Sequence, residues 1–168
     1  MFRVGLGFDN HRLANGRPLW IGGLEIPAPV GELAHSDGDV LLHALTDALL
    51  GAVAAGDIGE HFPDSDPRWK DQPSALFLRH AATLVREKGF LLVNVDATIL
   101  LEKVKLSPYK RVIAEKVREL LRDTWDLDPG AISIKAKTME GCDAVGAGEA
   151  IVAQVVVLLE KSQASNNL

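Results

Sequence analysis

Two histidines and one aspartate within the first 43 residues have the types and spacing of a metal site. Asp9 and His11 are two residues apart at the end of the apolar run 2–8, which predicts a strand, so their side chains share one face. His43 lies in a stretch that predicts a helix. Two imidazoles and one carboxylate suit zinc or a similar transition metal, and three protein ligands leave a coordination position open, as in catalytic sites. We therefore expect a catalytic metal site that binds an oxygen-rich ligand.

The helix expected at residues 38–55 is apolar on nearly every side. Asp39, His43 and Asp47 interrupt it at intervals of four, which places them on one face. Taken alone, His43 fits better as a hydrogen-bonded core histidine. A metal ion bound by His43 together with Asp9 and His11 would give all three polar groups a partner. This favours His43 as a metal ligand. Asp39 or Asp47 could then orient an imidazole from behind.

Two later segments combine charged side chains with backbone amides. Segment 102–107 follows an expected strand, so its amides and Lys105 could bind an anion or a base edge, although a solvated turn fits this segment better. The run 135–140 is expected to alternate along a strand, with Thr138 and Glu140 on one face. A hydroxyl and a carboxylate there would suit a phosphate and a hard cation such as Mg²⁺, and a half-exposed strand is an equally good interpretation.

The remaining candidate groups indicate little chemistry by themselves. Asp57, Ile58 and Gly59 could hold sugar hydroxyls or only close a turn, and His61 and His80 are expected at the surface. The single cysteine excludes an intrachain disulfide and fits a reducing compartment. Neither a nucleophile elbow nor a phosphate-binding P-loop motif occurs, so covalent catalysis has no obvious nucleophile.

Length and composition favour one soluble, cytoplasmic domain over residues 1–168, with 161–168 as a frayed tail. The 168 residues are 47% hydrophobic, enough for a real core. A formal charge of −5 without a basic patch argues against nucleic acid as a partner. No apolar segment approaches membrane-spanning length, and no leader pattern begins the chain.

Apolar runs and helical patterns interleave, which predicts a single α+β domain. The run 56–73 contains too much Gly, Pro and Asp for a regular element, and a loop of this length is more often functional than idle. The expected strands lie at 2–8, 19–26, 90–101, 131–138 and 150–159, and the expected helices at 38–55, 74–88 and 108–125.

Five motifs, in order along the chain, resemble the 2-C-methyl-D-erythritol 2,4-cyclodiphosphate synthase family of the non-mevalonate isoprenoid pathway. The likeness runs from about residue 3 to residue 159 and continues through Asn94-Val-Asp96 and residues 135–140. The chain departs from the family pattern at Ala144 and Ala147, where many members carry an aromatic residue and an arginine. The motifs are Gly7-Phe-Asp-Asn-His11, Ala34-His-Ser-Asp-Gly-Asp39, His43-Ala-Leu-Thr-Asp47-Ala-Leu-Leu-Gly51, Gly56-Asp-Ile-Gly59 and Phe62-Pro-Asp-Ser-Asp66.

The resemblance implies a fold, an oligomer and a reaction. The fold would be a mixed four-stranded sheet covered by helices on one face, ferredoxin- or chorismate-mutase-like, in a homotrimer with active sites between subunits. The reaction would convert 4-diphosphocytidyl-2-C-methyl-D-erythritol 2-phosphate to the 2,4-cyclodiphosphate with release of CMP. Zn²⁺ would be held by Asp9, His11 and His43, and Mg²⁺ or Mn²⁺ by Glu140.

The resemblance also implies roles for individual residues. His35 and Thr138 would stabilise the transition state. The erythritol part would lie near residues 57–59, with residues 62–66 closing over it. Residues 101–107 of an adjacent subunit would form the cytidine pocket, mostly through main-chain contacts. The substrate-binding set implied is Asp9, His11, His35, Ser36, Asp57, Ile58, Gly59, Phe62, Pro63, Asp64, Ser65, Asp66, Leu101, Lys105, Leu106, Ser107, Lys137, Thr138, Met139 and Glu140.

Two other functions are compatible with a zinc site of this kind. One is a zinc phosphodiesterase acting on a nucleoside-diphosphate conjugate, in which a metal-activated water attacks phosphorus. The other is an oligomeric binding protein that zinc only stabilises. A protein that zinc only stabilises would not need the polar face of helix 38–55, the Asp-rich run 56–73 and two segments suited to binding anions. The synthase is therefore the better interpretation.

Overall fold

A five-stranded mixed sheet forms the centre of the protein. The structure is a computed structural model that describes residues 1–34, 36–63, 65–69 and 72–162. The strand order is β4-β1-β7-β5-β6; β5 and β6 are parallel, and the other neighbours are antiparallel. The strands are β1 (Phe2–Asn15), β4 (Val30–Leu33), β5 (Phe90–Leu100), β6 (Ile132–Lys137) and β7 (Ala150–Lys161).

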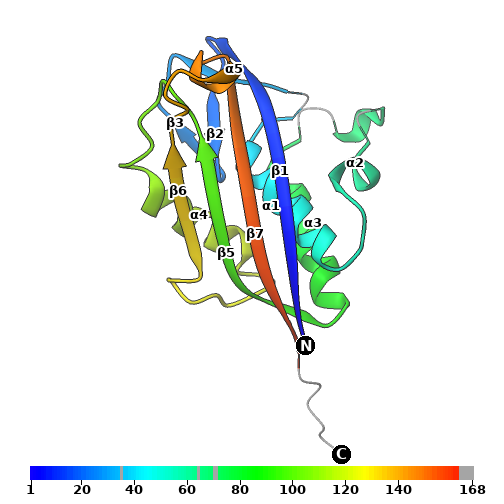
Figure 1. Cartoon of the computed structure of the whole chain (residues 1–168). Helices are drawn as coiled ribbons and strands as arrows, with labels where there is room; N and C mark the ends of the chain where they lie inside the picture. Colours follow the sequence, from blue (N-terminus) through cyan, green and yellow to red (C-terminus); the bar gives the residue numbers. More distant parts are fainter. Residues whose placement is uncertain (35, 64, 70–71, 163–168) are drawn as a thin grey trace, which may run out of the picture.

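Three helices cover one face of this sheet (Figure 1). α1 contacts β1, β7 and α3, which explains why its sequence is apolar on almost all sides. No helix within the described residues is long and apolar enough to cross a membrane. The long helices are α1 (Val40–Ala52), α3 (Ser74–Glu87) and α4 (Lys110–Leu121), and the shorter elements are α2 (Ile58–His61), the 3₁₀ turn η1 (Pro67–Trp69), α5 (Asp143–Gly146) and the hairpin β2 (Leu19–Ile21) and β3 (Leu24–Ile26).

The α+β class and the mixed sheet agree with the sequence-based prediction, but the strand count does not. The sheet has five strands rather than four, because β4 pairs with β1 at the edge despite the adjacent Pro29. An edge strand tolerates a flanking proline, since one side of it forms no ladder. The run 56–73 also contains α2 and η1, and the side chain of Asp57 caps α2 by accepting a hydrogen bond from Glu60 N. Lys161, the first residue of the expected frayed tail, pairs with Phe90, and residues 163–168 lie outside the described residues.

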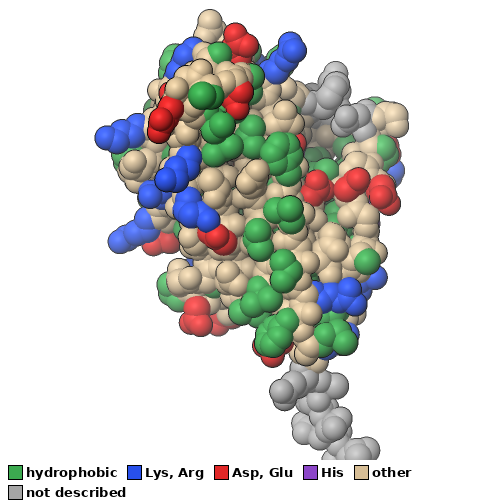
Figure 2. All heavy atoms as spheres, viewed as in Figure 1, with side chains coloured by type: hydrophobic (Ala, Val, Ile, Leu, Met, Phe, Trp, Pro, Cys, Tyr) green, Lys and Arg blue, Asp and Glu red, His purple; other side chains and the backbone are tan. Residues whose placement is uncertain are grey.

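The sheet face opposite the helices exposes a row of apolar side chains. Along β1, glycines alternate with outward-facing apolar residues, and Val156 of β7 lies beside them. Figure 2 shows hydrophobic side chains gathered on this face. An apolar surface of this kind marks a protein contact in many soluble proteins. The exposed fractions are 62% for Phe2, 66% for Val4, 69% for Leu6, 53% for Phe8 and 41% for Val156.

Glu32 of β4 is a buried carboxyl in the layer between the sheet and the hairpin. The residue is 1% exposed, and its Oε2 accepts a hydrogen bond from Trp20 N at 3.1 Å. Within the described part of the chain its Oε1 has no hydrogen-bond partner. Burial raises the pKa of Glu32 to about 8, and the negative charges of Asp39 and Asp37 add to the effect of burial. The carboxyl is therefore largely neutral at pH 7.

This raised pKa makes stability fall with rising pH. Between the ordinary glutamate pKa near 4.5 and the folded-state pKa near 8, the folded chain binds more protons than the unfolded chain. The contribution of Glu32 to the free energy of unfolding is therefore fully present below pH 4.5 and is lost as the pH rises towards 8. We expect Glu32→Gln to remove this decline, a difference on the order of several kcal/mol at pH 8. Urea unfolding at a series of pH values tests it, with the exposed Glu25→Gln as control. Parallel pH curves for wild type and Glu32→Gln would contradict the assignment.

Candidate metal centre and substrate cavity

Asp9, His11 and His43 meet at one point between the sheet and α1. Asp9 Oδ2 lies 3.0 Å from His11 Nε2 and 3.0 Å from His43 Nδ1, and the two imidazole nitrogens are 3.2 Å apart. The first two residues share a face of β1, and the third projects from α1. The predicted convergence of these three residues is therefore confirmed.

The geometry of this trio fits a tetrahedral metal ion. Ligand atoms about 2.0–2.1 Å from a tetrahedral zinc lie about 3.3 Å apart. The three observed separations of 3.0–3.2 Å come close to that value. Two imidazole nitrogens and one carboxylate oxygen form a donor set that zinc accepts, and the fourth corner is left for a ligand. The residues present therefore fit zinc.

Electrostatics within the trio favour an ionised Asp9. Burial raises the pKa of Asp9, but hydrogen bonds and charge from His11 and His43 outweigh burial and lower the pKa to about 2. For His43, burial lowers the pKa, but the hydrogen bond to Asp9 and its negative charge outweigh burial, so the pKa is raised overall. A metal ion would take the place of the protons that these imidazoles share with the carboxylate.

A hydroxyl relay orients His43 from the side away from the trio. Its Nε2 lies 2.8 Å from Ser74 Oγ and 3.2 Å from Ser36 Oγ. The Ser74 hydroxyl donates to Asp37, and the Ser74 amide donates to the other oxygen of that carboxylate at 3.1 Å. With Nδ1 free to bind a metal, Nε2 carries the hydrogen and donates a hydrogen bond to Ser74 Oγ.

Asp39 and Asp47, which were expected to orient an imidazole, form hydrogen bonds with backbone amides instead. Asp39 accepts hydrogen bonds from Gly22 N and Gly23 N and caps α1 at Leu42 N, and Asp47 accepts from Ile58 N. The prediction for Asp39 and Asp47 was therefore wrong. Helical spacing correctly places Asp39 and Asp47 on the same face of α1 as His43. It gave no information about Ser74, which reaches the site from the start of another helix.

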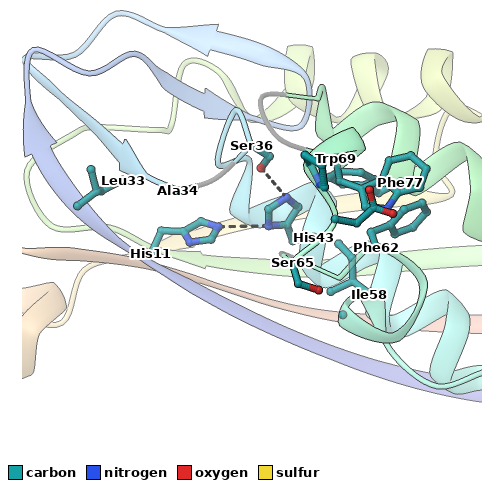
Figure 3. Close-up of a pocket in the computed structure, with 13 residues that line it drawn as sticks. His11, Leu33, Ala34, Ser36, His43, Ile58, Phe62, Ser65, Trp69 and Phe77 are labelled. Carbon is teal, nitrogen blue, oxygen red and sulfur yellow. Dashed lines mark hydrogen bonds between the residues drawn. The ribbon is translucent and has the colours of Figure 1, made fainter.

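A cavity of about 650 Å³ opens beside the trio. His11, Ser36 and His43 lie at one end of it, and Phe62, Trp69 and Phe77 form an aromatic wall (Figure 3). Phe62 and Phe77 have ring centroids 4.6 Å apart, and Trp69 meets Phe62 edge-on at 5.0 Å. The other lining residues are Leu33, Ala34, Ile58, Gly59, Ser65, Asp66 and Pro67.

A second cluster forms where residues 101–107 meet residues 137–140. Glu102 Oε2 accepts a hydrogen bond from Met139 N at 2.8 Å and ties the two segments together. Neither segment contributes to the cavity lining drawn from the described residues. Two strands, β7 and β5, lie between β1 and β6. The trio and this second cluster are at the same end of the sheet, because Asn10 of β1 and Leu100 of β5 both pair with Val152 of β7.

Comparison with known proteins identifies the chain's relatives. The sequence model of the YgbB family matches residues 2–160. The chain belongs to the YgbB family. Among its relatives, 2-C-methyl-D-erythritol 2,4-cyclodiphosphate synthase of Geobacillus thermodenitrificans (strain NG80-2) is 50% identical over 164 residues, covering 98% of this chain and 100% of the relative.

Solved structures of the same family superimpose closely. One, described as 2C-methyl-D-erythritol-2,4-cyclodiphosphate synthase in a form with CDP bound, has a TM-score of 0.85 and 46% identity and covers 94% of this chain and 100% of that one. The bifunctional IspDF from Campylobacter jejuni has a TM-score of 0.90 and 38% identity; the match covers 96% of this chain and 42% of that longer chain. The fold described above is therefore that of the YgbB family.

Several YgbB-family positions predicted to bind substrate line the cavity, and others do not. Asp9, Asp57 and Pro63 lie outside the lining, and the Asp57 carboxylate caps α2. The Asp66 carboxylate accepts hydrogen bonds from the exposed Arg68, whose guanidinium lowers the pKa of Asp66. His35 and Asp64 lie outside the described residues. The predicted residues that do line it are His11, Ser36, Ile58, Gly59, Phe62, Ser65 and Asp66.

The predicted strand at residues 135–140 ends early. β6 stops at Lys137, so Thr138 and Glu140 do not alternate along a strand as expected. Glu140 instead adopts a left-handed backbone with φ 52°. In the segment before it, Leu101 and Leu106 are each 3% exposed, which leaves their backbone rather than their side chains for a ligand. Lys105, Ser107, Lys137, Thr138 and Glu140 are exposed.

A close contact between β1 and α1 sets the distance between the metal ligands. A Cβ placed on Gly5 would lie 1.8 Å from Ala48 O, and one placed on Gly7 would lie 1.8 Å from Ala44 O. Real Cβ atoms cannot approach a backbone oxygen so closely. The two glycines therefore let α1 lie against the strand, and His43 reaches Asp9 and His11 because of this contact.

We expect Gly7→Ala to separate α1 from β1, lower the free energy of unfolding by about 1–3 kcal/mol and weaken zinc binding at least about tenfold. Chelator competition with Zn²⁺ and urea unfolding measure the two effects. Gly51→Ala is the matched control, because a Cβ at this helical position meets no atom within 4 Å. It should gain about 0.5–1 kcal/mol and leave zinc affinity unchanged. Wild-type zinc affinity in Gly7→Ala would show that the contact does not set the geometry.

Proposed function

We propose that this chain converts 4-diphosphocytidyl-2-C-methyl-D-erythritol 2-phosphate to 2-C-methyl-D-erythritol 2,4-cyclodiphosphate and CMP. The observation that carries the proposal is the meeting of Asp9, His11 and His43 at the end of a cavity, in a chain that matches the YgbB family over residues 2–160. Relatives about 50% identical over nearly their full length carry the name of this synthase. A structural relative has CDP bound, which supports a substrate with a CDP part.

The chemistry requires charge neutralisation and a folded substrate rather than a protein nucleophile. The 2-phosphate attacks the β-phosphorus, forming the ring bond while the bond to CMP breaks. A phosphate monoester is mostly dianionic at pH 7, because its second pKa is about 6, so it needs no general base. Holding both ends of the substrate brings the two phosphates together, and such positioning is worth up to about 7–11 kcal/mol. The absence of an activated nucleophile motif agrees with this mechanism.

The trio would hold zinc at one end of the cavity. A bound zinc ion supplies positive charge for a phosphate oxygen of the substrate. Asp9 and His11 present their ligand atoms from a rigid strand, and Ser74 and Ser36 fix the ring of His43 from its other nitrogen. Phe62, Trp69 and Phe77 exclude water from the adjoining wall, which strengthens charge interactions within the cavity. His35 is proposed to stabilise the transition state on the basis of the family motif alone.

We assign the second cluster to the nucleotide end of the substrate. Lys105 and the backbone of residues 101–107 would bind the cytidine part, and Thr138 would contact a phosphate. Glu140 would bind Mg²⁺ or Mn²⁺; a single protein carboxylate suits such an ion when substrate phosphates supply further ligands. Glu102 holds the two segments together through its hydrogen bond to Met139 N.

A homotrimer would unite the two clusters. Two strands lie between β1 and β6 in one chain, and the apolar row on β1 and β7 offers the surface for association. With the trio of one chain beside the second cluster of the next, every active site lies between subunits. Closed cyclic symmetry gives each chain one contact of each kind. We propose the cytoplasm as its compartment, consistent with a single cysteine.

The reaction is tested by ³¹P NMR of the purified protein with the proposed substrate, Zn²⁺ and Mg²⁺ in ¹⁸O-labelled water. We expect CMP and a pair of coupled cyclic-diphosphate signals without ¹⁸O, because the nucleophile is a phosphate of the substrate. A linear product carrying ¹⁸O would favour the zinc phosphodiesterase. Unchanged substrate together with loss of the fold on chelation would favour a zinc-stabilised binding protein.

The shared active site is tested by mixing two variants. His43→Ala removes the trio and Thr138→Ala alters the second cluster, so each homotrimer should be nearly inactive. Mixed trimers assembled from equal amounts should recover about a quarter of the wild-type activity, because that fraction of interfaces combines two intact halves. Refolding the two variants together, with separately refolded variants as control, measures the effect. No recovery in mixtures shown to be mixed trimers would mean that each site belongs to one chain.

A further inference from the structure

Two imidazoles outside the trio also meet at ligand distance. His61, at the end of α2, and His80, on α3, bring Nδ1 and Nε2 to 3.3 Å from each other. Their ring centroids are 5.3 Å apart. The sequence predicted both at the surface, and only His80 is exposed; His61 is half-buried. Nothing in the proposed reaction uses this pair.

The backbone fixes which nitrogen of His61 is free. Its Nε2 lies 2.8 Å from the carbonyl oxygen of Ala55, just beyond α1. A carbonyl oxygen only accepts hydrogen bonds, so Nε2 carries the proton and Nδ1 of the neutral ring presents a lone pair. Metal-binding histidines are commonly held in this way, with the second nitrogen donating to a backbone carbonyl. The free lone pair of His61 points at His80.

The separation of the two nitrogens suits a shared ion as well as a direct hydrogen bond. A distance of 3.3 Å is long for a hydrogen bond donated by nitrogen. It equals the spacing of about 3.3 Å between two nitrogens bound to one tetrahedral zinc. Burial lowers the pKa of His80 and the neighbouring His61 lowers it further, against an opposing effect of Glu87. The lowered pKa of His80 favours the neutral ring, which is the form that binds metal.

We propose that His61 and His80 form a second transition-metal site. It would bind a divalent cation that favours imidazole ligands, such as Zn²⁺, with water molecules completing the coordination. Two protein ligands make it weaker than the three-ligand trio. The bound ion would join α2 to α3 beside the cavity. Phe62, which follows His61 directly, lines that cavity and meets His80 edge-on at 5.1 Å. Occupation of the site would therefore restrain the aromatic wall.

Calorimetric titration of metal-free protein with Zn²⁺ alone tests this site. Wild type should bind two equivalents per chain, one tight and one weaker. His80→Gln should keep the tight equivalent and weaken the second at least about tenfold. Retention of the tight equivalent reports that the variant is folded. Arg79→Gln, the exposed neighbour on α3, is the matched control and should bind both equivalents.

Two further outcomes decide between sites. In ¹H–¹⁵N spectra of the imidazoles, the second equivalent should shift His61 Nδ1, after the first has shifted His11 and His43. The proposal is overturned if wild type binds one equivalent, or if His80→Gln still binds two with unchanged affinity. It is also overturned if the second equivalent disappears in Glu140→Gln and persists in His80→Gln, because the weaker ion would then belong to the second cluster.

Discussion

The contact of α1 with β1 is the constraint on which the metal centre depends. Metal ligands must be placed within a few tenths of an ångström, and here they come from a strand and a helix that are far apart in sequence. Rigid elements place side chains more accurately than loops do, provided that the distance between the elements is fixed. Glycines on the buried face of β1 let the backbone of α1 set that distance directly. The apolar side chains on the other faces of α1 then pack against α3 and hold the helix in place.

The sequence predicted the centre of the site because two histidines and an aspartate on regular elements indicate a shared metal ion. Asp9 and His11 are two apart on a strand, and the helix that carries His43 has an unmistakable apolar pattern. The relay through Ser74 could not be predicted in the same way, because serine and aspartate are common at the surface and their types do not indicate that they contact each other. The aromatic wall of Trp69 and Phe77 was missed as well. Such contacts depend on how α3 packs, which periodicity does not specify.

The errors in the fold prediction have physical causes of a similar kind. Prolines and glycines before β4 indicate a break in an isolated segment, whereas the free edge of β1 supplies hydrogen bonds that outweigh this local preference. At the end of β6 the reverse occurs. The alternation of residues 135–140 suggests a strand, but Glu102 takes the amide of Met139 and the backbone turns at Glu140. In both places a partner distant in sequence decides the local structure.

The pairing of β1 with β7 has a consequence for the order of events during synthesis. Phe2 is opposite Glu160, so the two central strands of the sheet come from opposite ends of the described chain. Asp9 and His11 are made well before residues 150–161, and until those residues emerge their strand has only β4 as a neighbour. During that interval α1 can form by local hydrogen bonds, but the part of its apolar surface that packs against β7 has nothing to cover it. The nascent chain therefore carries a partly unburied helix until β7 is made.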